Sequence, residues 1–112
     1  MDKFIGMVSQ VVESSSISTT QWEMIFREFK KEFLRELRMV DAKKPVFNKG
    51  HFYISGFFTK DKQVYYFSIS DVRYFGVSKL LIRTAKDYND FTGGRNNEIT
   101  IEKNMLMKFF NN

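Results

Sequence analysis

The chain of 112 residues contains no cysteine, one proline and one histidine. Without cysteine it forms no disulfide, offers no thiolate to a metal and has no thiol nucleophile. Its longest unbroken apolar runs are only a few residues, far short of the roughly 18 that a membrane-spanning helix needs. Residues 1–8 also lack the basic and long apolar regions of a signal peptide. We therefore expect a soluble cytoplasmic protein with no membrane contact.

The composition supports one folded domain. The chain is rich in aromatic residues, with 13 phenylalanines, five tyrosines and one tryptophan. A chain of this length buries roughly two thirds of its unfolded surface, so it has no need of disulfides or metal to form a core. No internal repeat or proline- and glycine-rich linker divides it. Residues 1–112 are predicted to form a single domain.

The apolar residues recur at helical spacing up to about residue 40 and alternate after it. Residues 3–12 predict a short amphipathic helix. A second helix is predicted to end near Met39, before the segment that leads to Pro45. Thr20 and Glu23 fit a capping box at its beginning. Its apolar stripe consists of Trp22, Ile25, Phe26, Phe29, Phe33 and Leu37.

The second half of the chain reads as a small sheet. Two aromatic and β-branched runs, residues 51–59 and 63–69, flank a charged turn and predict a β-hairpin. Residues 78–85 predict a third strand and residues 98–102 a fourth, while residues 41–50 and 87–97 read as loops. Ser70 and Asp71 fit the start of one helical turn, and residues 105–110 fit a final short helix. The order indicates an α+β fold with two N-terminal helices, an antiparallel sheet of three or four strands and a short C-terminal helix.

The residues suited to catalysis are few. His51 is the only imidazole, and the carboxylates show no spacing typical of metal ligands. Nothing resembles a nucleophile elbow or a phosphate-binding Walker loop. Gly93 and Gly94, followed by Arg95, fit either an ordinary tight turn or a nest of backbone amides that binds an anion. We expect no catalytic residue, no metal and no cofactor.

The surplus of positive charge favours a polyanionic partner. The chain has 18 Lys and Arg against 13 Asp and Glu, a formal net charge of +5. On the second helix a row of glutamates, Glu28, Glu32 and Glu36, flanks the apolar stripe. The cations Arg27, Lys31, Arg35 and Arg38 gather on the face opposite the core. That face fits contact with a nucleic-acid backbone, a solvated surface with ion pairs three residues apart, or docking onto a protein.

A second basic cluster lies around the predicted hairpin and comprises Lys43, Lys44, Lys49, Lys60 and Lys62. Strand alternation places Tyr53, Phe57 and Tyr66 on the outward side of the hairpin. Aromatic rings bordered by lysines are typical of surfaces on which single-stranded nucleic acid stacks its bases. The alternative is that helices on both faces of the sheet bury these rings.

These patterns predict a small non-enzymatic nucleic-acid-binding accessory protein for single-stranded DNA or RNA, active in replication or recombination of a phage or mobile element. The predicted contacts are Lys43, Lys44, Lys49, Tyr53, Phe57, Lys60, Lys62, Tyr66, Arg27, Lys31, Arg35 and Arg95. One alternative is a protein-binding inhibitor or accessory subunit that acts on a host or element-encoded enzyme. A third is a small ribonuclease-type toxin that uses His51, Arg83, Lys86 and Arg95.

Overall fold

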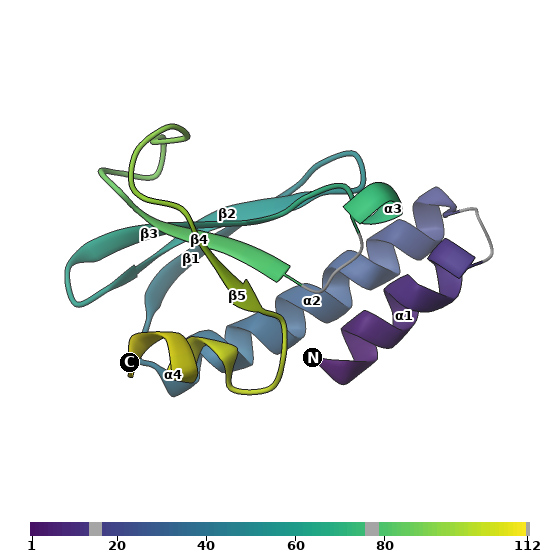
Figure 1. Ribbon diagram of the computed structural model, residues 1–112, viewed down its shortest axis with the longest axis horizontal. Coiled ribbons are helices and arrows are strands. Elements are labelled where there is room, and N and C mark those ends of the chain that lie inside the picture. The colour runs from purple at the N-terminus through teal and green to yellow at the C-terminus, as the bar shows by residue number, and fades with distance from the viewer. Residues whose placement is uncertain (14–16, 76–78, 112) are drawn as a thin grey trace.

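The computed structural model describes residues 1–13, 17–75 and 79–111. Its elements, in chain order, are α1 (Asp2–Glu13), α2 (Thr19–Met39), β1 (Lys43–Lys49), β2 (Ile54–Lys60), β3 (Gln63–Ile69), α3 (Val72–Phe75), β4 (Lys79–Ala85), β5 (Asn97–Thr100) and α4 (Met105–Phe110). The sheet lies on one side, and α1, α2 and α4 lie on the other (Figure 1). The predicted α+β fold is confirmed, with five strands in place of three or four.

The sheet is an antiparallel meander in the order β1-β2-β3-β4-β5. Asp61 and Lys62 form the turn between β2 and β3, with φ angles of 51° and 69°. Positive φ at both central residues is what a two-residue type I′ hairpin turn requires, so the predicted hairpin is confirmed. Across the middle of the sheet Phe57 pairs with Tyr66, and Tyr66 pairs with Arg83. These three residues therefore share one face.

Strand β1 occupies a segment that the sequence predicts to be a loop. All of its residues except Phe47 are exposed, so no alternation of apolar and polar residues marks it. Its pairing with β2 is interrupted between Lys43 and Val46, where Lys44 has a φ of 52°. A bulge, a proline and lysines are features of an edge strand that resists pairing with other chains. The loop prediction was wrong because Phe47 is the one residue of β1 that packs toward the core, which is too little to give an alternating pattern.

Helix α2 begins two residues earlier than its predicted capping box implies. Ser18 is the N-cap: its hydroxyl accepts a hydrogen bond from the Gln21 backbone N–H, and the Gln21 side chain accepts one from the Ser18 N–H. This reciprocal pair satisfies two of the free amides at the helix start. The Thr20–Glu23 box was wrong, whereas the predicted end at Met39 is confirmed.

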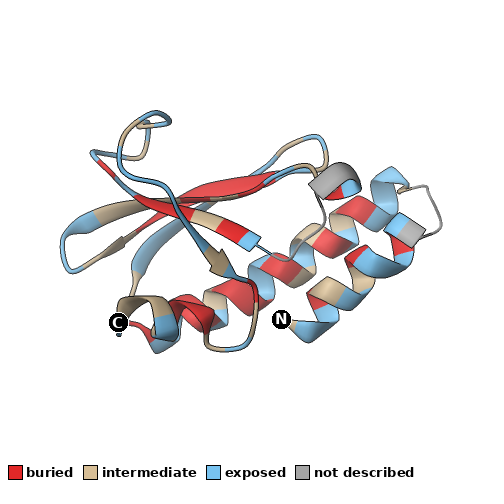
Figure 2. Cartoon of the chain, viewed as in Figure 1, coloured by how far each residue is buried: buried red, intermediate tan, exposed pale blue. Residues whose placement is uncertain are grey.

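The core lies between α2 and the sheet. Phe33 packs on Phe67 of β3 with ring centroids 4.6 Å apart, and Phe29 stacks on Phe33 at 5.1 Å. The buried stretches of α2 face the buried stretches of the central strands (Figure 2). Phenylalanines are the largest of the fully buried side chains. No helix of the described residues covers the second face of the sheet.

Candidate nucleic-acid interface

The acidic row of α2 points into the molecule and makes tertiary contacts. Glu28 pairs with Lys3 of α1 at 3.3 Å, and Glu32 lies 3.4 Å from the amino group of Met1. The carboxylate of Glu36 accepts hydrogen bonds from the backbone N–H of Asn104 at 3.0 Å and of Leu106 at 3.3 Å. The sequence also allowed these glutamates to pair with cations three residues away on the same helix. In the structure their partners come from other segments instead.

The basic row of α2 faces solvent and is left with almost no negative neighbours. Arg27 has a long contact of 3.9 Å to Glu23. Lys31, Arg35 and Arg38 are exposed and form no ion pair with any described residue. The row spans about 16 Å at the rise of an α-helix. Because the glutamates turn inward, the outer face of α2 is strongly electropositive.

The lysines around the hairpin divide into two groups. Lys43, Lys44, Lys60 and Lys62 lie at one end of the sheet, because Lys43 pairs with Thr59 beside the β2–β3 turn. Asp41 and Asp61 neutralise two of them, Lys43 and Lys60. Lys44 and Lys62 are exposed and have no carboxylate partner among the described residues.

Lys49 lies at the opposite end of β1, about 20 Å away at the rise of a strand. Its ammonium is 2.9 Å from Glu23 of α2, and this ion pair lowers the pKa of Glu23 through a hydrogen bond and the positive charge of Lys49. The predicted five-lysine cluster is thus not a single patch. Lys49 ties β1 to α2, and the other four lysines surround the hairpin end.

The face of the sheet opposite the helices carries an aromatic cluster. Phe57 is only 1% exposed, because the loop of residues 86–96 covers it. From this loop Tyr88 stacks on Phe57 with centroids 5.5 Å apart, and Phe91 meets the same ring edge-on at 5.3 Å. The prediction that Phe57 faces outward from the helices is confirmed, but the inference that its ring is exposed was wrong.

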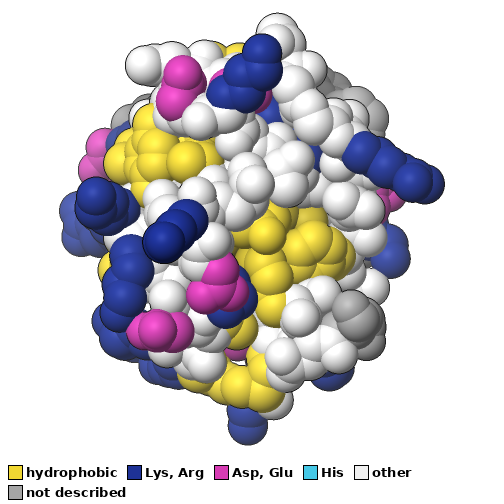
Figure 3. All heavy atoms as spheres, turned by 90° about the vertical axis from the view of Figure 1, so that its left-hand side faces the viewer, with side chains coloured by type: hydrophobic (Ala, Val, Ile, Leu, Met, Phe, Trp, Pro, Cys, Tyr) yellow, Lys and Arg dark blue, Asp and Glu magenta, His cyan; other side chains and the backbone are white. Residues whose placement is uncertain are grey.

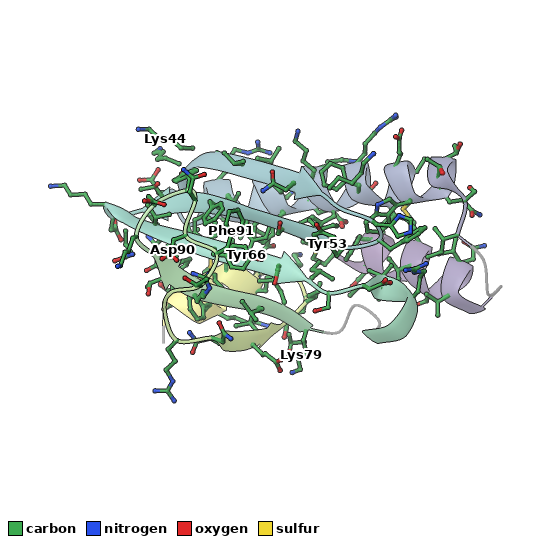
Figure 4. The ribbon with its side chains drawn as sticks, turned by 90° about the horizontal axis from the view of Figure 1, so that it is seen from above. Lys44, Tyr53, Tyr66, Lys79, Asp90 and Phe91 are labelled. Carbon is green, nitrogen blue, oxygen red and sulfur yellow. The ribbon has the colours of Figure 1, made fainter. Side chains whose placement is uncertain are left out.

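Phe91 is the exposed member of this cluster, with 58% of its surface accessible, and it lies 6.0 Å from the half-buried ring of Tyr66. Figure 4 shows Phe91 over Tyr66, with Asp90 and Lys44 toward the same end of the sheet. Tyr53 is 47% exposed but stands farther along the sheet, in the segment between β1 and β2. Sequence reasoning missed Tyr88 and Phe91, although two aromatic residues in a polar loop are themselves a signal.

The loop of residues 86–96 is fixed to the sheet by its backbone and side chains. The guanidinium of Arg83, only 4% exposed, lies over the Tyr66 ring at 4.4 Å. Its two terminal nitrogens donate to the backbone oxygens of Asp90 at 2.9 Å and Thr84 at 3.2 Å. Arg83 therefore holds the loop down through Asp90, and no described carboxylate lies within ion-pairing distance of it.

Backbone amides of the loop bind the carboxylate of Asp90, and Gly93 is the residue of the glycine pair that donates to it. Asp90 accepts hydrogen bonds from the N–H groups of Lys86 at 2.9 Å, Gly93 at 2.8 Å and Thr92 at 3.2 Å. These bonds, that of Lys86 first, lower the pKa of Asp90 to about 2. The loop is thus a turn, and these amides bind the carboxylate of Asp90 within the same loop.

An open cavity of about 490 Å³ lies between this loop and the hairpin end. Lys62 and Lys86 line it, together with Asp90, Gly93 and Gly94 of the loop. Both lysines are exposed and have no ion-pair partner among the described residues. Lys44 is exposed at the same end of the sheet, and Arg95 is an exposed residue farther along the loop. Figure 3, which views the molecule from this end, shows basic side chains along one side and hydrophobic surface at the centre.

The residues considered for a ribonuclease site do not converge. His51 is exposed and precedes β2, whereas Lys86 follows β4 at the level of Thr59 near the end of β2. These positions are at least about 16 Å apart along the sheet. Arg83 is buried with both of its terminal nitrogens engaged. Among the described residues, no group of three or more His, Asp or Glu side chains is placed to hold a metal ion.

The fold and this surface define an α+β protein with a five-stranded antiparallel meander, helices on one face and an aromatic loop on the other. No helix in the described ranges has the length and apolar character to cross a membrane. No protein family, curated protein or solved structure matches the chain.

Proposed function

We propose that the protein is a non-enzymatic accessory protein that binds single-stranded nucleic acid at the aromatic end of the open sheet face. The observation that carries the proposal is Phe91, an exposed ring at the end of the sheet where Lys44, Lys62 and Lys86 are also exposed, with no carboxylate partner among the described residues. A small basic protein of this kind fits a cytoplasmic role in replication or recombination of a phage or mobile element.

Base stacking accounts for the preference for single strands. A nucleobase stacked on Phe91 contributes about 1–3 kcal/mol, without regard to which base it is. Bases of a duplex are already stacked on each other, so this gain requires unpaired nucleotides. The Phe91 ring packs against the buried Phe57 and against Tyr66, and Tyr88 stacks on Phe57. Tyr53, away from this cluster, is not part of the primary contact.

The lysines supply the phosphate contacts. Each phosphate neutralised on a single strand contributes about −0.7 to the slope of log affinity against log salt. Phosphate contacts from Lys44, Lys62 and Lys86 therefore give a slope of about −2. The row Arg27, Lys31, Arg35 and Arg38 is a second basic surface, on the outer face of α2 and on the helix side of the sheet. A longer strand that reaches this row gives a steeper slope.

Fluorescence anisotropy with labelled single strands tests the proposal. Oligo(dT) and oligo(U) of six and twenty nucleotides, and a twenty-base-pair duplex, are titrated at 50 and 200 mM salt. We expect both single strands to bind more tightly than the duplex. Phe91→Ala should weaken binding about tenfold, and the matched control Tyr53→Ala should leave it within twofold. Absence of binding to any single strand at 50 mM salt would contradict the proposal.

A second candidate function, docking onto a protein, is favoured by two methionines. Met24 and Met39, 53% and 42% exposed, lie on α2 at the two ends of the basic row. Exposed methionines adapt to varied protein surfaces, whereas their apolar side chains gain nothing from contact with a charged phosphate backbone. Affinity capture before and after nuclease treatment separates the two functions. A stoichiometric protein partner that survives nuclease favours docking, and one that disappears favours binding through nucleic acid.

A further inference from the structure

An apolar groove lies between α1 and α2, at one end of the basic row. The groove has a volume of about 160 Å³ and is lined by Met7, Gln10, Val11, Gln21, Met24 and Ile25. Four of these six side chains are apolar, and Met24 is 53% exposed. An apolar cavity of about 150 Å³ is large enough to hold a benzene ring. The groove therefore has room for one apolar side chain of another molecule.

Met24 brings this groove into line with the cations of α2. Residues three or four positions apart on a helix share one face, and this spacing links Met24 to the whole basic row. We call this set the α2 stripe; its members are Met24, Arg27, Lys31, Arg35 and Arg38, and all five are exposed. The stripe is about 21 Å long at the rise of an α-helix. It is apolar at one end and positively charged over the rest.

The charge and the groove together define the kind of ligand. Lys31, Arg35 and Arg38 form no ion pair with any described residue, so they are available to negative groups. Complementary charge steers a partner toward such a surface and disfavours partners of like charge. The groove adds a place for an apolar side chain, a group that a phosphate backbone lacks.

We propose that the α2 stripe binds an acidic segment of a partner protein. The segment places its carboxylates on the cations and one apolar side chain in the groove beside Met24. This assignment rests on the second candidate function, docking onto a protein, and specifies the partner's chemistry. It does not depend on nucleic-acid binding at Phe91, which lies on the other face of the sheet.

A second copy of the chain does not supply such a segment. The chain has a net charge of +5, and the glutamates beside the stripe already have partners within the molecule. Two α2 stripes brought together would place cations against cations, and like charges across an interface oppose association. The occupant is therefore a different chain with a surplus of carboxylates.

A phage-displayed library of twelve-residue peptides, selected on the full-length protein, tests the proposal. We expect the enriched peptides to carry several carboxylates and an apolar residue toward one end. One enriched peptide is then synthesised in two altered forms. In the first, serine replaces the apolar residue, and in the second, amides replace the carboxylates. Each form should bind about tenfold more weakly, because each lacks one of the two features that the stripe recognises.

Two triple glutamine variants locate the peptide on the surface. One replaces Lys31, Arg35 and Arg38, and the other replaces Lys44, Lys62 and Lys86. Both remove three positive charges, but only the first should weaken the peptide, by about tenfold. A six-nucleotide single strand should show the opposite pattern. A failure of peptide binding is thereby distinguished from a failure of nucleic-acid binding.

A second pair of variants tests the groove. Met24→Glu should weaken the peptide about tenfold, because it replaces an apolar contact by a charge that repels the acidic segment. Val46→Glu makes the same kind of change at an exposed apolar residue of β1 and should leave the affinity unchanged. The melting temperatures of both variants show that they fold.

Several results would overturn the proposal. They are the absence of enriched acidic peptides, unchanged affinity in Met24→Glu, and a peptide that depends on the lysines of the hairpin end instead of those of α2. Full affinity of the serine form would mean that the stripe binds any polyanion, nucleic acid included. A doubled mass in light scattering that Met24→Glu abolishes would mean that the occupant is a second copy.

Discussion

The hydroxyl of Tyr88 donates a hydrogen bond of 2.7 Å to the backbone oxygen of Lys44, a residue 44 positions earlier in the chain. Lys44 has a left-handed φ of 52° at the bulge of β1. The Thr59 hydroxyl lies 2.8 Å from the same Tyr88 oxygen. One side chain of the aromatic loop thus joins the bulged edge strand to the end of β2. The loop that displays Phe91 is therefore held by tertiary contacts.

Tyr88→Phe removes this link and keeps the ring that stacks on Phe57. The lost hydrogen bonds should cost about 1 kcal/mol of stability, which lowers the melting temperature by about 4 °C. Hydrogen exchange should quicken in residues 86–96. Tyr53→Phe is the matched control, because the described structure shows no hydrogen bond to its hydroxyl. Equal stability of the two variants would show that the Tyr88 hydroxyl does not hold the loop.

Gly94 is required by its conformation and by its neighbour. Its φ is +81°, and an added Cβ would lie 2.3 Å from the backbone oxygen of Thr84. Gly94→Ala should therefore destabilise the protein by about 1–3 kcal/mol. Gly6→Ala should do the opposite and add about 0.5–1 kcal/mol, because Gly6 lies in α1 with open space around it. Thermal denaturation of the two variants measures the change in stability of each. A stabilising Gly94→Ala would show that alanine is tolerated at this backbone conformation.

Periodicity predicted the elements whose burial is regular. The apolar stripe from Trp22 to Leu37 predicted α2, and the alternation of apolar residues in 63–69 predicted β3. β1 was missed because an edge strand exposed on nearly every residue has no period to detect. The face of Phe57 was predicted correctly, yet its burial depends on Tyr88 and Phe91, which come from a distant loop. Strand alternation gives the face of a residue, and only tertiary packing gives its exposure.

The glutamates of α2 show the same limit. Their spacing indicates one helix face, but their partners are the start of α1 and the start of α4, which no local pattern identifies. The consequence for function is direct. The sequence suggested that α2 exposes negative and positive charges side by side. Because the glutamates turn inward, the exposed row is positively charged.

Glu36 is expected to be the most important of these glutamates for stability. Its carboxylate accepts two backbone N–H groups at the start of α4, and Glu36 itself is buried. Glu36→Ala leaves both amides without that acceptor and should cost about 2–3 kcal/mol. Glu28→Ala, which removes only the contact with the exposed Lys3, should cost less than about 1 kcal/mol. Urea denaturation compares the two, and an equal cost would contradict the capping role of Glu36.

Acid should loosen the aromatic loop through Asp90. Its pKa is lowered to about 2 in the folded protein by backbone hydrogen bonds, against about 3.9 in an unfolded chain. A lowered folded pKa means that the stabilisation is complete above pH 4 and is lost as the pH falls toward 2. Amide exchange in residues 86–96 should therefore quicken over this window before that of β3. In Asp90→Asn, amide exchange in residues 86–96 should be fast already at pH 7 and should not quicken further between pH 4 and pH 2.

The salt dependence of binding identifies which basic surface meets the nucleic acid. Replacing Lys44, Lys62 and Lys86 by glutamine should reduce the slope for a six-nucleotide strand by about 2, at about 0.7 per phosphate contact. Replacing Lys31, Arg35 and Arg38 by glutamine should leave the six-nucleotide strand unaffected and reduce the slope only for a twenty-nucleotide strand. The reason is distance, because a short strand stacked on Phe91 does not reach the outer face of α2. The reverse pattern, with the helix variant affecting the short strand and the lysine variant not, would mean that the strand follows α2 and that Phe91 is not its stacking residue.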